Sequence, residues 1–109
     1  MARYQFRFLI PDTQHGNQQT YSAYVTTLKR LSELQGNKQG NVRVEEVMAT
    51  GGSVVGSTRI EAPSCEEAMR FVCRETPILN LEWHVEEHVD PNRMAEILEN
   101  GIKAKITAR

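Results

Sequence analysis

The chain has little net charge, few aromatic residues and no long apolar run. Its 13 Lys and Arg residues oppose 14 Asp and Glu residues, which gives a formal net charge of −1. This balance argues against nucleic-acid binding through bulk positive charge. No stretch approaches the ~18 apolar residues of a membrane span, and no secretory signal opens the chain. We therefore expect no membrane partner, and a nucleic-acid partner is disfavoured.

Cysteine is also scarce, because Cys65 and Cys73 are the only two in the sequence. Both fall in one expected helix, where eight residues rise ~12 Å and exceed the ~7 Å Cα separation that a disulfide tolerates. A Cys-x-x-Cys pair is missing, which argues against a zinc ribbon or a thiol redox motif. We interpret both thiols as small apolar side chains in a reducing compartment. The expectation is a cytoplasmic protein without a metal or a cofactor.

What the sequence does contain is a regular succession of period-two and helical patterns. At 109 residues with 39% apolar composition, the chain is long enough for one domain with its own core. Apolar residues that alternate predict strands, and those that recur every three or four predict helices. The expected elements are a strand over 4–10, a helix over 20–35, strands over 42–49 and 53–61, a helix over 64–76, a strand over 78–89, a helix over 90–101 and a short strand over 102–106.

Local signals mark several boundaries. The Gly51-Gly52 pair between two β-rich runs predicts a hairpin with a positive φ angle at one or both glycines. Gly56, inside the second of these runs, predicts a bulge or a close backbone approach. Ser64 and Glu67 form a capping-box pattern. Asp90-Pro91 has the cap and first-turn residues of a helix.

These elements predict an α+β fold, a two-layer sandwich. The first six match a ferredoxin-like βαββαβ arrangement, and the last helix and strand form a C-terminal αβ extension. Met94, Ile97 and Leu98 are expected on the inner face of the last helix. The residues expected to share one core are Phe6, Phe8, Leu28, Leu31, Phe71, Val72, Leu81 and Trp83.

The polar side of the strand over 78–89 is the first candidate for chemistry. Alternation places four ionisable residues on one side, namely Glu82, His84, Glu86 and His88. Carboxylates and imidazoles in a row can bind a ligand or tune a proton-transfer group. The alternative is a solvated edge strand whose charges discourage aggregation. Two histidines four residues apart on a strand have Cα atoms ~13 Å apart, too far to share one metal.

Neither a nucleophile elbow nor a lysine-bearing phosphate loop occurs in the sequence. We therefore expect a small non-catalytic protein-interaction module, an accessory, regulatory or inhibitor protein such as those carried by phages or plasmids. Its partner would be another protein or a second copy in a homodimer. Trp83, Tyr21 and Tyr24 are the candidate interface residues, because Trp and Tyr dominate interface hot spots.

Two other functions stay open. One is a dimeric α+β domain that binds a small ligand, or acts as an enzyme, through the row from Glu82 to His88. The other is nucleic-acid binding, suggested by the aromatic strand with Tyr4, Phe6 and Phe8. The strand over 53–61 has no aromatic residue to extend such a stacking surface. Burial distinguishes protein interaction from ligand binding, because an exposed Glu/His row favours a protein partner and a closed pocket favours a small ligand.

Overall fold

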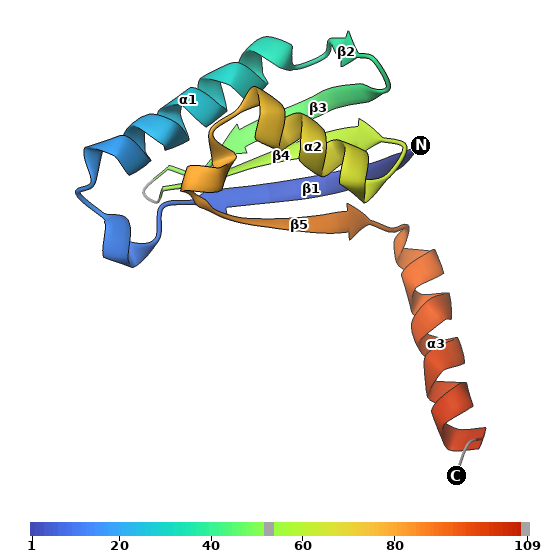
Figure 1. Cartoon of the computed structure of the whole chain (residues 1–109). Helices are drawn as coiled ribbons and strands as arrows, with labels where there is room; N and C mark the ends of the chain where they lie inside the picture. The colour runs from blue at the N-terminus through green and yellow to red at the C-terminus, as the bar shows by residue number, and fades with distance from the viewer. Residues whose placement is uncertain (52–53, 108–109) are drawn as a thin grey trace.

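The protein is an α+β sandwich with a five-stranded antiparallel sheet and three α-helices (Figure 1). A computed structural model describes residues 1–51 and 54–107. Its elements are β1 (Ala2–Leu9), α1 (Gln18–Leu34), β2 (Lys38–Gln39), β3 (Val42–Ala49), β4 (Val55–Ala62), α2 (Cys65–Glu75), β5 (Glu82–His88) and α3 (Pro91–Thr107), with 3₁₀ turns η1 (Asp12–Gln14) and η2 (Ile78–Asn80).

The strands lie in the order β2-β3-β4-β1-β5, and every neighbouring pair is antiparallel. Helices α1 and α2 cover one face of this sheet (Figure 1). Tyr4, Phe6 and Phe8 of β1 are buried under them, whereas Arg3 and Arg7 point to the opposite face and are exposed. The period-two pattern of β1 is thus the pattern of a strand covered on one side only. We call the uncovered side the open face.

One continuous core lies between the sheet and the two helices. Most of the expected core residues are buried in it, namely Phe6, Phe8, Leu31, Phe71, Val72 and Leu81. Leu28 and Trp83 are half-buried and pack against its margin. Six of the eight are therefore central, and the other two lie where the helix layer ends.

The spacing of the apolar residues over 20–35 predicts one buried stripe, namely Tyr21, Tyr24, Val25, Leu28, Leu31 and Leu34. Helix α1 buries Tyr24, Leu31 and Leu34 of this stripe but is rotated slightly away from the rest of it. Tyr21 and Val25 are exposed, while Thr20 and Thr27 are buried beside Ala23. Thr27 Oγ1 donates to the Ala23 carbonyl at 2.7 Å, so its hydroxyl is satisfied and can be buried at low cost. Because threonine is polar, the spacing of apolar residues does not identify this inner face of α1.

Strands β3 and β4 pair as the expected hairpin, but the positive φ angle predicted at its glycines is not found at Gly51. Gly51 does not adopt a positive φ angle, and Gly52 lies outside the described residues. The register shift between β3 and β4 falls between Val44 and Glu46. The irregularity therefore lies in β3 and not at Gly56 of β4. The positive φ angles at Gly16, Gly36 and Gly40 mark loops instead.

The strand expected over 78–89 begins late. Residues 78–80 form the turn η2, in which Ile78 is buried and Leu79 is exposed. The alternation of Leu79, Leu81, Trp83 and Val85 predicts that Leu79 lies on the apolar face of this strand, and that prediction was wrong. Pro77 precedes this turn and cannot donate to a strand ladder, which favours a turn before the strand begins.

The C-terminal αβ extension was also predicted wrongly, because α3 continues through Gly101 to Thr107. Ile102 and Ile106 alternate with lysines, but they are also four apart, which suits a helix equally well. Lys and Ala are good helix formers, and the ~1 kcal/mol cost of Gly101 in a helix is affordable over this length.

Helix α3 projects from the end of β5, away from the sandwich (Figure 1). The radius of gyration is 16.9 Å, against about 13 Å for a compact chain of this length. Among the described residues, no helix has both the length and the apolar character needed to cross a membrane.

Candidate functional site

The predicted polar row lies on the open face of β5, the last strand of the sheet. All four side chains are exposed, with 58% of the His84 side chain accessible. His84 Nε2 lies 3.8 Å from Glu82 Oε1, and His88 hydrogen-bonds Gln5 Oε1 at 3.1 Å. The row is thus a solvated surface, and its two histidines have different neighbours. No group of three or more His, Cys, Asp or Glu side chains suited to a metal occurs in the part of the chain described.

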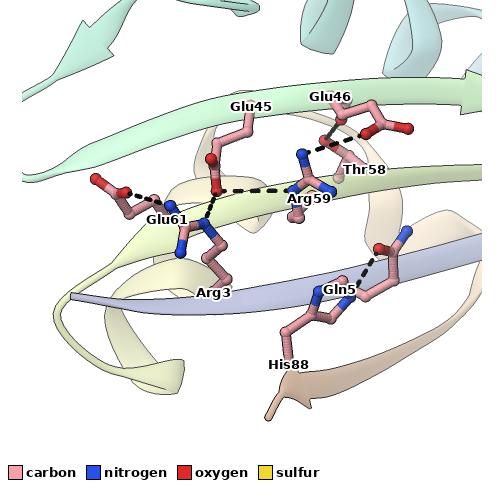
Figure 2. A network of polar contacts seen from close by, with 8 residues as sticks. All are labelled: Arg3, Gln5, Glu45, Glu46, Thr58, Arg59, Glu61 and His88. Atoms are coloured by element: carbon pink, nitrogen blue, oxygen red, sulfur yellow. Dashed lines mark hydrogen bonds and ion pairs between the residues drawn. The ribbon is translucent and has the colours of Figure 1, made fainter. Parts of the chain in front are cut away.

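An ion-pair network continues the open face across β1, β4 and β3 (Figure 2). Arg3 Nε donates to Glu45 Oε1 at 2.8 Å, and its Nη2 lies 3.6 Å from Glu61 Oε2. Arg59 Nη2 lies 3.3 Å from Glu46 Oε2. Two arginines face three glutamates, so the network offers no net positive surface to a phosphate backbone. Its members are partly solvated, and each pair contributes no more than about 1 kcal/mol to stability.

The three predicted interface aromatics occupy different environments. Tyr21 is exposed on α1, whereas Tyr24 is 8% exposed and packs against Phe8 with ring centroids 5.7 Å apart. Burial also raises the pKa of Tyr24. Tyr24 is therefore a core residue and is unavailable as an interface anchor. Trp83 stacks on Phe6 at 6.0 Å between centroids and stays half-buried, on the helix side of β5.

One flank of α2 carries an apolar surface. Cys65, Met69 and Cys73 recur every four residues and are half-buried, and they line an open hollow of about 470 Å³. The opposite flank of α2, at Glu67 and Arg74, borders residues 39–42 before β3. The Cys65 flank therefore faces the β5 side of the sheet. Sequence reasoning missed this surface, although its spacing, offset from the core residues Ala68 and Val72, was readable from the helical pattern.

The thiols on this flank are poorly suited to nucleophilic catalysis. Burial raises the pKa of the Cys73 thiol, which keeps it protonated near neutral pH and weakens it as a nucleophile. The Cys65 Sγ–Met69 Sδ separation is 3.7 Å, a contact between two soft sulfur atoms rather than with a base. The flank is thus an apolar surface whose Cys73 thiol is a weak nucleophile near neutral pH.

Helix α3 carries a cluster of exposed large apolar side chains. Met94, Ile97 and Leu98 are 41%, 45% and 59% exposed, and every residue over 91–101 is exposed. They were expected to line an inner face, and that prediction was wrong because α3 does not fold back on the sandwich. Asp90 Oδ1 caps the helix, accepting from Asn92 N at 2.9 Å and from Arg93 N at 3.2 Å.

Comparison with known proteins adds no relative, since no family model, no curated protein and no solved structure matches this chain. The arrangement of the described surfaces therefore carries the functional argument.

Proposed function

We propose that this protein is a small non-catalytic protein-interaction module, of the accessory, regulatory or inhibitor kind, and that α3 is its binding element. The observation that carries the proposal is the position of α3, which leaves the sandwich with Met94, Ile97 and Leu98 exposed on it. Isolated helices of this length are only marginally stable in water, and they gain stability by burying an apolar face. A partner surface would supply that burial.

The remaining surfaces support binding over catalysis. The row from Glu82 to His88 is exposed, and the open face beside it holds paired charges rather than a pocket with convergent polar groups (Figure 2). A ligand site normally encloses most of its ligand. The small-ligand alternative would require a second chain to cover this face. The nucleic-acid alternative would require a positive surface, and the mixed charges of the open face weigh against it.

The fold suits this role. We infer a ferredoxin-like arrangement of β1, β3, β4 and β5, supported by their order β3-β4-β1-β5 and by the crossover positions of α1 and α2. In that arrangement β5 is an edge strand, so its outer backbone groups can also bind a strand from a partner. The two free thiols support a reducing compartment, and we place the protein in the cytoplasm.

Photo-crosslinking tests the proposal in cells that express the full chain. A photoreactive phenylalanine analogue replaces Leu98 on α3, and in a matched control it replaces Lys29, an exposed residue on α1. We expect covalent protein adducts from position 98 and few from position 29. Equal or absent adducts at position 98 would contradict a role for α3 in protein binding.

A further inference from the structure

The exposed apolar stripe of α3 has a matching surface on the same chain. We define the α2–β5 shelf as Cys65, Met69 and Cys73 of α2 with Trp83 and Val85 of β5, all half-buried and all in contact with the core. Tyr4 lies between the two halves, since it pairs with Glu87 of β5 and its pKa is raised by burial, by Glu87 and by Cys65. The shelf is the margin where the helix layer stops short of the last strand.

The dimensions of the two surfaces agree. Helix α3 has 17 residues, or about 25 Å at 1.5 Å per residue. Strand β5 has 7 residues, or about 23 Å. A helix laid along β5 beside α2 would therefore cover the shelf from end to end.

The side-chain spacing also agrees. Met94 and Leu98 on α3 are four residues apart, as are Cys65, Met69 and Cys73 on α2. Rows of this spacing form ridges on a helix surface that can pack into the grooves of a neighbouring helix. Methionine at both surfaces helps such packing, because its flexible thioether fills irregular gaps.

Charges at the rims do not oppose this contact. Arg70 pairs with Glu66 beside the shelf at 2.6 Å, and Arg93 pairs with Glu96 on α3 at 3.3 Å. These four rim charges are thus neutralised within their own surfaces and would enter the contact as pairs.

We propose that α3 of one copy packs on the α2–β5 shelf of a second copy, and that the second copy returns the same contact. This deepens the proposed function, on which it rests, by naming the partner. The link between β5 and α3 favours exchange over closure within one chain. It consists of Val89 and Asp90, and a residue before proline is restricted to extended conformations, so α3 is directed outward as Figure 1 shows.

The area of the exchanged contact reaches the lower limit for a specific interface. A helix ~25 Å long and ~10 Å wide covers ~250 Å² of the surface beneath it. Two reciprocal contacts, each counted on both surfaces, remove on the order of 1,000 Å² from solvent, the area at which specific interfaces begin. Exchange of an identical element between copies is a common route to such dimers.

Disulfide trapping tests the exchange with the native thiols of the shelf. If α3 runs alongside α2 from the same end, position 98 lies near Cys73. Leu98→Cys is exposed on α3, so the variant is expected to fold, which circular dichroism checks. Mild copper-phenanthroline oxidation at about pH 8.5, where an exposed thiol such as the one introduced at position 98 ionises readily, should yield a covalent dimer on a non-reducing denaturing gel.

Two controls establish which thiol forms the disulfide and which side of α3 faces the shelf. Leu98→Cys combined with Cys65→Ser and Cys73→Ser should lose the dimer, which shows that a shelf thiol forms the bond. Glu96→Cys lies on the other side of α3 and should trap at least tenfold less. A dimer that persists in the triple variant, or an internal disulfide within one chain, would overturn the exchange.

The same variants separate this inference from the proposed function. Absence of a trapped dimer together with adducts from position 98 to a different protein overturns the exchange and leaves the proposed function standing. Absence of both the trapped dimer and the adducts from position 98 contradicts the exchange and the proposed function alike. Sedimentation of the unmodified chain supplies a second measurement that depends on no substitution.

Discussion

Phe8 and Gly56 face each other across β1 and β4, and the Phe8 ring fills the space that a side chain at position 56 would need. A Cβ built on Gly56 would lie 2.5 Å from Phe8 Cε2 and 3.1 Å from Leu28 Cδ2. Phe8 is fully buried against Tyr24, so its ring has little freedom to move. The close approach expected from a glycine within a strand is therefore confirmed, and it fixes how β1, β4 and α1 pack.

Gly56→Ala should lower the free energy of unfolding by about 1–3 kcal/mol, because the added methyl overpacks the core. Denaturant melts measure the change. Gly51→Ala is the matched control, since nothing lies within 4 Å of a Cβ there, and it should change stability much less. A Phe8→Leu background should reduce the cost of Gly56→Ala; equal costs in both backgrounds would contradict the contact.

Ser64→Ala should cost about 1 kcal/mol, the usual contribution of an N-cap side chain. Ser64 Oγ accepts from Glu67 N at 3.2 Å at the start of α2. Thermal or denaturant melts give the value, with Ser22→Ala on exposed α1 as the control that should cost nothing. A melt indistinguishable from the unmodified protein would show that Ser64 does not cap α2.

The register of α1 predicts which of its apolar residues matter. Leu31 is fully buried, and Leu31→Ala should cost about 2–5 kcal/mol. Leu28 is half-buried at the core margin, so Leu28→Ala should cost less. Val25 is exposed, and Val25→Ala should stay within about 0.5 kcal/mol. Equal losses at positions 25 and 31 would refute the rotation of α1.

Cys73 should ionise at a higher pH in the folded chain than in the denatured chain, because burial raises the pKa of its thiol. Alkylation rates of a Cys65→Ser variant, measured against pH with and without denaturant, report this difference. Because this pKa is raised in the folded chain, the folded protein should lose stability as the pH rises above the ordinary thiol pKa, where only the denatured thiol ionises freely. Coincident profiles would contradict the burial of Cys73.

Period-two patterns with buried aromatics predicted the sheet well, because each strand has one covered side. Helix α2 was equally readable, since Ser64 and Pro77 bound it on both sides. Helix α1 was found but rotated, because Thr20 and Thr27 are polar in sequence yet buried in the structure, where the Thr27 hydroxyl donates to the Ala23 carbonyl. Spacing does not reveal such a local hydrogen bond.

The last segment shows where sequence reasoning fails. Ile102 and Ile106 satisfy both a strand and a helix pattern, and only the presence of a neighbouring strand could decide between them. The inward placement of Met94, Ile97 and Leu98 was inferred from their spacing, which identifies an apolar face but not the molecule that covers it. The α2 flank was missed for a related reason, because the small apolar character expected of its cysteines does not indicate which surface they form together with Met69.

The most direct measurement of the central claim is sedimentation equilibrium of the full chain at micromolar concentration, beside Leu98→Glu and Glu96→Gln. Our account predicts a dimer of twice the chain mass for the unmodified protein and for Glu96→Gln, and a monomer for Leu98→Glu, whose charge would have to be buried against the shelf. A monomeric unmodified chain, or a dimer that survives Leu98→Glu unchanged, would contradict the exchange of α3 between copies.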